Sequence, residues 1–420
     1  MKILWLSPGL LLPLDKGGKL RTWHLMRHLA RRHHITFLSF ADPDAEDAHR
    51  AGMSEVCAEL ITVPRREVAK GSAAFLLDAA AHMVRRLPYA VGKYRSRDLQ
   101  RRMTDLLASG QFDLVVCDFL APVANVPEHL PCPSVLFTHN VEAEIWRRHA
   151  ETATSPLRKA LLTTQWRRTV RLERDAVRRF DLVLAVSDTD RRTLLQAYGP
   201  LRHPVHVVPT GVDTGYFANV AGPARPRHMV FTGSMDWLPN EDGMVYFVRD
   251  VLPLIRQKEP SATLSIVGRA PTPAITRLGS EEGVEVTGRV DDVRPHMAAG
   301  AVYIVPLRIG GGTRLKIFEA MAMGKPVVST TIGAEGLPVT PGTDLVIADT
   351  ANAFAEAVVR LFRDEAERRR VGAAAQRLVA ERYDWSAVFG HLEEALEAAA
   401  GRSRPRDVSA RAGLELQTRN

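Results

Sequence analysis

Residues 308–330 of the chain read RIGGGTRLKIFEAMAMGKPVVST, and this stretch decides the fold class. The apolar run before the glycines, residues 302–307, predicts a strand, and the β-branched run 326–330 predicts another. Between them, apolar residues recur at helical spacing, so we expect a helix over about 314–323 that stops at Gly324. Strand, turn, helix and strand in this order form the repeating unit of an α/β fold.

The same alternation continues along most of the chain. The short apolar runs are mostly continuous Val, Ile and Leu segments, as expected of parallel strands covered on both faces. Longer segments with helical periodicity separate them, which predicts an α/β protein with doubly wound parallel sheets. The expected strands are 3–7, 35–40, 114–119, 134–139 and 182–187 in the first half, and 229–234, 264–268, 284–290, 302–307, 326–330 and 345–349 in the second.

A stretch rich in Gly and Pro, residues 203–228, separates two sets of strands and suits an exposed linker. We therefore expect a first Rossmann-like domain over 1–205 and a second over 206–400, whose last helix is free to return to the first domain. Residues 401–420 are polar and irregular in composition, which predicts a disordered tail.

Length and charge limit the class of protein. At 420 residues the chain is too long for one core, so two or three domains are expected. The formal charge of +8 suits phosphate-bearing small molecules, anionic membranes or nucleic acid, and equally a solvated basic surface without a specific partner. Nucleic acid is the weaker of these partners, because no nucleic-acid-binding motif accompanies the charge.

The cysteines and the apolar segments indicate the compartment. Cys57, Cys117 and Cys132 are odd in number and lack metal-ligand spacing, so we expect reduced thiols, no metal site and a cytoplasmic protein. The first apolar run is too short for a signal peptide. The longest apolar candidate, residues 73–84, is too short to cross a membrane.

The turn after the strand at 302–307 predicts an anion site. Glycines leave room for phosphate near the free amides of a helix start, and Lys316 lies one turn into that helix. Glu319 follows on nearly the same face, where a carboxylate suits the vicinal hydroxyls of a ribose. Phosphate and diol together indicate a nucleotide, although the two residues also suit a surface ion pair. The turn itself contains Gly310, Gly311, Gly312 and Thr313, the last as the helix N-cap.

The segment GGGTRLKIFEAMAMGKPVVSTTIGAEGL (310–337) resembles the nucleotide-sugar-binding signature of family-4 glycosyltransferases. These are retaining enzymes of the GT-B fold, in which two Rossmann-like domains face each other across a cleft. The resemblance covers about residues 1–395. Three further parts of it are DKGGKLRTWHLMRHLARRHHITFLSF (15–40) for the first loop and helix, LVLAVSDTDRRTLLQAYG (182–199) with VHVVPTGVDTGYF (205–217) for the end of the first domain and its hinge, and VEVTGRVDDVRPHMAAGAVYIVPL (284–307) for the strand and loop beside the base.

The resemblance assigns roles by position. Glu319 matches the second glutamate of the family's paired-glutamate motif, which holds the ribose, and Lys316 lies where the donor phosphate is met. Gly17 and Gly18 match the glycines of the first loop, which face the phosphates from the other domain. His139 matches a histidine close to the donor sugar, and a histidine at a strand's carboxyl end is also a reasonable site residue on topological grounds. A histidine that only bonds to nearby backbone is the alternative.

The sequence departs from the family in two places. Gly311 stands where the first glutamate of the motif is usual, so the contact that such a carboxylate makes to the donor sugar must come from backbone amides or be absent. The segment FTGSMDWLPNEDG (231–243) lacks the usual Arg and Lys, and we infer that Arg314 supplies this charge together with Lys316. The expected donor-binding set also includes Gly233 and Arg289, with Asn240 and Asp242 as further lining residues unless Asp242 caps a helix.

The resemblance implies a nucleoside diphosphate sugar as donor, a hydroxyl acceptor, and polysaccharide or glycolipid assembly, with the GGGTR form closest to a bacterial exopolysaccharide subgroup. Lys316, Arg314 and His139 are the expected catalytic residues, and no cofactor or strictly required metal is implied. Basic segments with aromatic residues at 64–102, 146–149 and 166–174 suit a glycan or lipid-linked acceptor at the inner face of the cell membrane. They equally suit ordinary solvated helix faces.

Other classes remain open at this point. A sugar-nucleotide epimerase of similar fold and a non-catalytic sugar-nucleotide-binding protein would both share the signature. A glycan phosphorylase would need a cofactor-lysine context, which does not stand out. A dinucleotide-binding oxidoreductase would need a Gly-x-Gly-x-x-Gly turn after the first strand, and SPGLLLPLDKGG (7–18) does not supply one.

Overall fold

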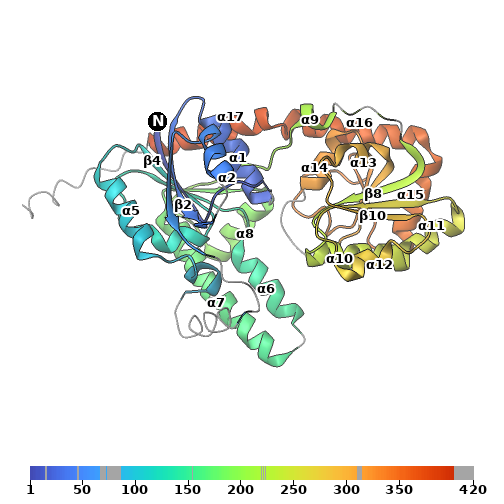
Figure 1. Ribbon diagram of the computed structural model, residues 1–420, viewed down its shortest axis with the longest axis horizontal. Helices are drawn as coiled ribbons and strands as arrows, with labels where there is room; N and C mark the ends of the chain where they lie inside the picture. The colour runs from blue at the N-terminus through green and yellow to red at the C-terminus, as the bar shows by residue number, and fades with distance from the viewer. Residues whose placement is uncertain are drawn as a thin grey trace, which may run out of the picture. The chain divides into compact units, whose positions relative to one another are not determined.

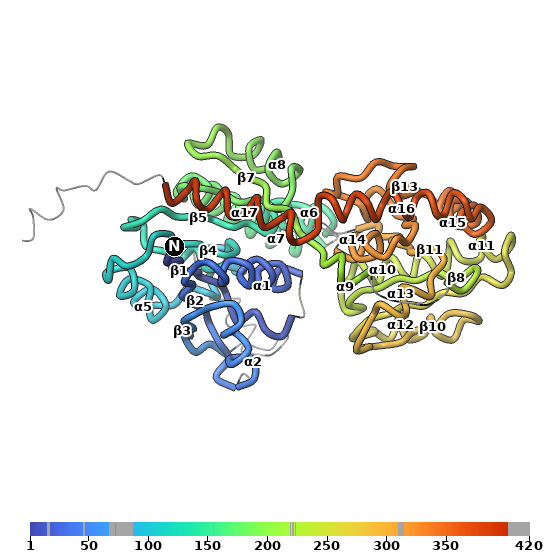
Figure 2. The backbone as a smooth tube through the Cα atoms, turned by 90° about the horizontal axis from the view of Figure 1, so that it is seen from above, coloured from blue at the N-terminus to red at the C-terminus, as the bar shows by residue number. Residues whose placement is uncertain are grey.

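The computed structural model divides into two compact units, drawn in two views in Figures 1 and 2. The first unit contains Met1–Ala185, Thr193–His206 and the chain from Leu392, and the second contains Val186–Arg192 and Val207–His391. The structure describes residues 1–14, 17–44, 47–66, 72, 87–153, 155–218, 220, 222, 224–309 and 315–401.

The first unit is built on a seven-stranded sheet with the strand order β3-β2-β1-β4-β5-β6-β7. This is a doubly wound, Rossmann-like order, in which the chain changes its direction of travel across the sheet between β1 and β4. All of β4 and all but the first residue of β1 are buried, as their continuous apolar runs predict. The strands are β1 (Lys2–Ser7), β2 (His34–Ala41), β3 (Glu59–Pro64), β4 (Leu114–Asp118), β5 (Ser134–Phe137), β6 (Leu182–Ala185) and β7 (Val205–Val207).

Helices connect these strands, and local sequence sets where they begin. Ser96 accepts a hydrogen bond from the Leu99 amide (3.3 Å) at the start of α5, and α7 begins with Pro156, where a proline costs no hydrogen bond. The helices are α1 (Gly17–Leu29), α2 (Asp47–Gly52), α4 (Tyr89–Gly92), α5 (Arg97–Ala108), α6 (Glu142–Thr152), α7 (Pro156–Arg179) and α8 (Asp188–Tyr198), with 3-10 turns η1 (Met53–Glu55) and η2 (Ala121–Asn125).

The second unit repeats the plan with a six-stranded sheet in the order β10-β9-β8-β11-β12-β13. The chain changes its direction of travel across the sheet between β8 and β11, so this sheet is also Rossmann-like. Every strand pairing within it is parallel. The two sheets confirm the expected α/β fold class. The strands are β8 (Arg225–Thr232), β9 (Thr263–Val267), β10 (Val284–Gly288), β11 (Gly300–Val305), β12 (Val327–Ser329) and β13 (Val346–Ile347).

The helix expected after the glycine-rich turn is present as α14 (Leu315–Ala322). It ends as predicted, because Gly324 adopts a left-handed φ of 65° and donates to the Met321 carbonyl at 2.9 Å. The other helices of this unit are α9 (Thr214–Ala218), α10 (Leu238–Tyr246), the π-helical η3 (Phe247–Val251), α11 (Leu252–Lys258), α12 (Pro273–Leu278), α13 (Arg294–Ala299), α15 (Ala351–Arg363), α16 (Glu365–Arg382) and α17 (Trp385–Ala400).

Two strands of the first sheet were absent from the sequence expectations, and both lie at its edges. β3 is only partly buried and ends in a proline, while β7 is three residues long and directly follows Pro204. Edge strands are covered on fewer sides, so they lack the continuous apolar signal that identifies the central strands.

The last helix, α17, belongs to both units in succession. At its start, Trp385 packs against the hinge so closely that a Cβ at Gly211 would lie 2.5 Å from the indole ring. From Leu392 onward its residues belong to the first unit, where Arg32 Nη1 donates to the Glu393 carboxylate at 3.0 Å. Apart from Gly401, the expected tail at 401–420 lies outside the described residues.

Candidate active site

The strand after which a doubly wound sheet changes direction marks where such folds bind ligands, at the carboxyl ends of the strands. In the first unit this is the edge formed by the ends of β1 and β4, and in the second the edge formed by β8 and β11. Of the expected site residues that the structure describes, Gly17, Gly18 and His139 belong to the first unit, and Gly233, Arg289, Lys316 and Glu319 belong to the second.

At the first edge, Phe119 follows β4 in the left-handed region, with φ of 72°. This conformation is costly for a residue with a Cβ, and such residues concentrate at functional sites. The Phe119 ring stacks on His139, with centroids 3.7 Å apart and planes inclined by 10°. A Cβ at Gly18 would lie 2.7 Å from the Phe119 ring, so the glycine allows the start of α1 to approach the pair.

His139 is buried in a chain of polar contacts. Arg21 Nη1 donates to its Nδ1 at 2.8 Å, because a guanidinium can only donate, and its Nε2 therefore donates to Asp118 at 2.6 Å. Asp118 also accepts from Thr22 Oγ1 at 3.0 Å. Burial lowers the pKa of His139 despite the opposing charge of Asp118, which favours the neutral imidazole. Both ring nitrogens are thus engaged by the protein, and a catalytic role for His139 stays a prediction.

A pocket of about 570 Å³ lies at the same edge, lined by the loops that follow β1, β2 and β4 and by α6 and α7. Its aromatic and charged lining includes Tyr94, Trp146, Arg65 and Glu142. The Arg65 guanidinium lies over the Tyr94 ring, 4.4 Å from its centroid, while Arg65 Nε donates to the Lys93 carbonyl at 3.2 Å. The pocket therefore presents a fixed cation and a carboxyl between aromatic walls.

Glu142 was missed by the sequence reasoning, and a second buried carboxyl holds it in place. The amides of Glu142 and Ala143 donate to Glu173 at 2.7 and 3.2 Å, and Tyr198 Oη donates to Glu173 at 2.6 Å. Burial raises the pKa of Glu142, and it raises the pKa of Glu173 to about 7. The only sequence signal for Glu142 is its position three residues after His139, at the start of a helix.

At the second edge, Gly233 follows β8 and makes room for a lysine. Lys316 Nζ donates to Asn240 Oδ1 at 2.9 Å and lies 3.9 Å from the centroid of the Phe231 ring. A Cβ at Gly233 would lie 2.7 Å from Lys316 Nζ and 2.6 Å from Asn240 Nδ2. Gly233 and Lys316, which are 83 positions apart in the chain, are thus brought together with Asn240 beside them.

Glu319 lies on α14, one turn after Lys316. Burial raises the pKa of its carboxyl to about 7, against the opposing effect of the Lys316 charge. At neutral pH the group is therefore divided between its two protonation states. Either state can accept a hydrogen bond from a ligand hydroxyl, and the carboxylate accepts more of them.

The structure describes some of the remaining expected residues and not others. Gly17 opens α1, and Arg289 is exposed just after β10. Asp242 does not cap a helix: it lies inside α10 and accepts two hydrogen bonds from Arg308, at 2.6 and 3.0 Å. The expected residues outside the described part of the chain are Gly310, Gly311, Gly312, Thr313 and Arg314.

None of the described helices is both long enough and apolar enough to cross a membrane. α7 has the length, with 24 residues, but carries many charged side chains. Within the same described ranges, no group of three or more His, Cys, Asp or Glu residues is arranged to hold a metal ion.

Comparison with known families identifies both units. Residues 16–216 match the model described as Glycosyltransferase Family 4, and residues 226–364 match the model described as Glycosyl transferases group 1. The first match covers most of the unit with the Gly18 and His139 edge. The second covers most of the unit with the Gly233, Lys316 and Glu319 edge.

Individual relatives agree with these families. A 44.6 kDa protein in the cps region of Klebsiella pneumoniae is 20% identical over 407 residues, which are 93% of this chain and 98% of the relative. A phosphatidyl-myo-inositol mannosyltransferase of Mycobacterium leprae is 31% identical over 52% of this chain, and the match spans 59% of that relative.

Solved structures share the fold at low sequence identity. Sucrose-phosphate synthase of Thermosynechococcus elongatus superimposes with a TM-score of 0.70 at 17% identity, over 95% of this chain and all of that one. HepE of Anabaena, in complex with UDP and glucose, gives 0.65 at 17% identity over the same shares. These likenesses establish the GT-B architecture, and both family matches are to glycosyltransferases. The chain belongs to the family-4 glycosyltransferases and is an enzyme that transfers sugars.

Proposed function

We propose that this glycosyltransferase takes its sugar from a nucleoside diphosphate sugar and transfers it, with retention, to a hydroxyl acceptor. The observation that carries the proposal is the placement of Lys316 and Glu319 on α14 beside Gly233, at the ligand edge of the second sheet. A cation and a carboxyl one helical turn apart suit a diphosphate and the diol of a ribose. The complex of the Anabaena neighbour with UDP and glucose supports the same class of ligand.

In this proposal Lys316 acts on the leaving group. As the bond from the anomeric carbon to the phosphate oxygen breaks, negative charge develops on the diphosphate, and a fixed ammonium group stabilises it. Arg314, which lies outside the described residues, adds a second cation. The acceptor hydroxyl attacks the anomeric carbon on the face that the diphosphate leaves, and the departing phosphate oxygen takes its proton. The products are the glycoside and the nucleoside diphosphate, and these cations make a metal not strictly necessary.

The first unit supplies the remaining contacts in this scheme. Gly17 and Gly18 open α1, whose N-terminal amides suit a phosphate, and His139 is held by Arg21 and Asp118 to face the donor sugar. The acceptor enters the pocket lined by residues of the segments at 64–102, 146–149 and 166–174. There Trp146 suits stacking on a sugar ring, and Glu142 accepts a hydrogen bond from an acceptor hydroxyl.

We further propose a role in bacterial polysaccharide or glycolipid assembly, in the cytoplasm at the inner face of the cell membrane. Two relatives support this setting: one is named for the cps region and the other for a phosphatidyl-inositol acceptor. The basic surface of a chain with a formal charge of +8 is compatible with an acceptor that is anchored among anionic lipids.

A donor screen tests the second-unit site. Uridine, guanosine and adenosine diphosphate sugars are titrated by calorimetry, and nucleotide release is then measured with membrane extract as the acceptor source, with and without a chelator. We expect Lys316→Ala and Glu319→Ala each to weaken binding of the preferred donor by at least about tenfold, since each removes a charge-assisted contact. Activity should persist in the chelator.

The matched controls are Lys258→Ala and Glu356→Ala, which remove a distant surface ion pair of the same unit with its atoms 3.8 Å apart. Both should bind the donor like the wild type. Wild-type donor affinity in the Lys316 and Glu319 variants would refute the site. Binding without nucleotide release in any acceptor extract would argue for a non-catalytic donor-binding protein.

Kinetics of a Trp146→Ala variant test the acceptor pocket. We expect the KM for the acceptor to rise by about tenfold or more, because a stacking surface is lost, while the donor affinity stays unchanged. A variant with raised donor Kd and an unchanged acceptor KM would contradict this assignment of the pocket.

A further inference from the structure

The hairpin of α6 and α7 ends in a segment of exposed side chains. The two helices lie against each other, and the hairpin tip, defined here as residues 155–161, begins α7 (Figure 1). All seven side chains of the tip are exposed. Leu157 is 82% exposed and Leu161 is 38% exposed, and their spacing of four residues places both on one face of the helix. Two leucines are therefore presented to the surroundings together.

The cations beside these leucines are not used by the fold. Arg158 and Lys159 lie between them in the sequence, and Arg167 is exposed two turns further along α7. None of the three forms an ion pair with another residue in the described ranges of the chain. The tip therefore combines apolar side chains with positive charge that no nearby carboxylate neutralises.

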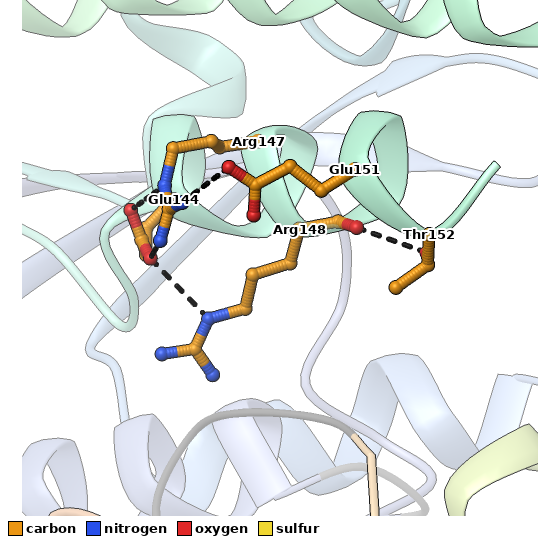
Figure 3. Close-up of polar contacts among 5 residues, drawn as sticks. All are labelled: Glu144, Arg147, Arg148, Glu151 and Thr152. Atoms are coloured by element: carbon orange, nitrogen blue, oxygen red, sulfur yellow. Dashed lines mark hydrogen bonds and ion pairs between the residues drawn. The ribbon is translucent and has the colours of Figure 1, made fainter.

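The carboxylates of the neighbouring helix are engaged elsewhere, as Figure 3 shows. On α6, Arg147 lies between Glu144 and Glu151, with Nη1 2.5 Å from the Glu151 carboxylate and Nη2 bonded to Glu144. Arg148 Nε also donates to Glu144, at 3.3 Å. These arginines hold Glu144 and Glu151 along that helix, so these two carboxylates form no ion pair with the cations at the tip.

We propose that the hairpin tip docks on an anionic lipid bilayer. Leu157 and Leu161 enter the boundary between headgroups and acyl chains, and Arg158 and Lys159 contact the lipid phosphates beside them. Both features are needed, because a short apolar face gives weak and reversible binding and each nearby cation strengthens it. Charge complementarity selects this partner over a second copy of the chain, whose own tip carries the same positive charge.

Docking at the tip would bring lipid close to the acceptor pocket. The pocket is lined by Trp146 of α6 and Thr169 of α7, the two helices that form the hairpin. Thr169 is twelve residues from Leu157, or about 18 Å along a helix, and Trp146 is about 9 Å from the end of α6. A lipid-linked acceptor in the same leaflet would thus lie within the length of the hairpin from the pocket. This last step rests on the proposed function, whereas the docking itself does not.

Vesicle binding by the full chain tests the docking without donor or acceptor. The chain is sedimented with vesicles of phosphatidylcholine mixed with phosphatidylglycerol, and with vesicles of phosphatidylcholine alone. We expect binding to the anionic vesicles that weakens with added salt. Leu157→Asp should reduce it by at least about tenfold, and Arg158→Glu with Lys159→Glu by more than about 100-fold.

Matched variants elsewhere on the first unit control for the change of residue type. Leu195→Asp alters a leucine that is 39% exposed on α8, and Arg101→Glu with Arg102→Glu reverses two charges on α5. These controls should bind anionic vesicles like the wild type. Equal losses in control and tip variants would show a diffuse basic surface and overturn the proposal. The proposal would also be overturned if the wild-type chain formed dimers through Leu157 and did not bind vesicles.

A fluorescent label locates the contact. All three native cysteines are buried, so Leu161→Cys provides a selectively reactive thiol for an environment-sensitive dye. We expect a blue shift on anionic vesicles at this position and none at Leu195→Cys. No shift at position 161 would refute insertion even if the chain sediments. Donor titration of the same variants separates the two proposals: wild-type donor affinity with lost vesicle binding confirms that docking is independent of the donor site.

Discussion

At the scale of single residues, the second-unit site depends on the absence of a side chain. Lys316 Nζ occupies the space that a Cβ at Gly233 would fill, and it lies over the Phe231 ring as well as bonding to Asn240. A lysine held on three sides loses little further freedom when it meets a phosphate. Its neighbour Glu319 has a carboxyl whose pKa, raised to about 7, makes this site sensitive to pH near neutrality.

The pH dependence of Glu319→Gln follows from that raised pKa. Between about pH 4.5 and 7 the folded chain keeps a proton that the unfolded chain has released, so the wild type loses stability as pH rises through this interval. Glutamine does not titrate, and Glu319→Gln should therefore gain thermal stability relative to the wild type from about pH 5 to pH 8. Donor affinity of the wild type should rise over the upper half of the same interval, because the ionised group accepts more hydroxyl hydrogen bonds.

Thermal denaturation and donor calorimetry at matched pH values measure both effects. Glu356→Gln, which alters an exposed carboxyl of the same unit, is the control and should follow the wild type at every pH. A wild-type donor affinity that does not vary with pH would contradict the ribose role of an ionised Glu319.

At the scale of elements, the α6 and α7 hairpin is fixed at its base by one buried carboxyl. Glu173 of α7 is fully buried and accepts from two amides at the start of α6 and from the Tyr198 hydroxyl. Glu173 replaces the N-cap acceptor of α6, because Val141 at the N-cap position of that helix has no side-chain acceptor. The orientation of Glu142 in the pocket therefore depends on a contact made 31 residues away.

Glu173→Ala tests this dependence. The substitution leaves buried donors without an acceptor, and we expect a loss of about 3 kcal/mol in the free energy of unfolding. Urea denaturation measures the loss, and faster hydrogen exchange at the Glu142 and Ala143 amides should accompany it. Glu151→Ala removes only the exposed partner of Arg147 and should cost less than about 1 kcal/mol. Equal effects of the two substitutions would show that Glu173 does not anchor the hairpin.

The parts of this molecule that the sequence predicts are those that depend on nearby residues. The central strands, α14 and its stop at Gly324 follow from local periodicity and turn chemistry, and Lys316 and Glu319 share one helix. The contacts of His139 could not be predicted this way, since Arg21 and Asp118 reach it from separate elements. Glu142 carries no motif of its own, and its carboxyl becomes notable only when a distant helix buries it.

At the scale of the whole molecule, the first unit contains both ends of the described chain. From Leu392 onward, α17 belongs to that unit, and Leu392 and Leu396 are fully buried there. Arg32 bonds to Glu393, and His28 lies 3.6 Å from the same carboxylate. The C-terminal segment is thus part of the first unit's core although it follows all of the second unit in sequence.

Truncation before Leu392 should therefore damage the first unit. A chain ending at His391 loses two fully buried leucines, worth about 2 kcal/mol each, and exposes the surface that they cover. We expect a separate, lower melting transition for the first unit while the second unit melts as in the full chain. A chain ending at Gly401 keeps all of α17 and should melt like the wild type. An unchanged melting profile for the shorter chain would refute this role of α17.

Because α17 is divided between the two units, the second unit is completed before the first during synthesis. The second unit needs only residues up to His391, so all of its parts have been made before the last part of the first unit exists. Most of the first unit leaves the ribosome first. The apolar surface that Leu392 and Leu396 cover in the finished protein therefore stays exposed until translation has nearly finished. Because exposed apolar surface on a nascent chain invites chaperones and aggregation, slow translation should harm the amino-terminal half of this enzyme more than the carboxyl-terminal half.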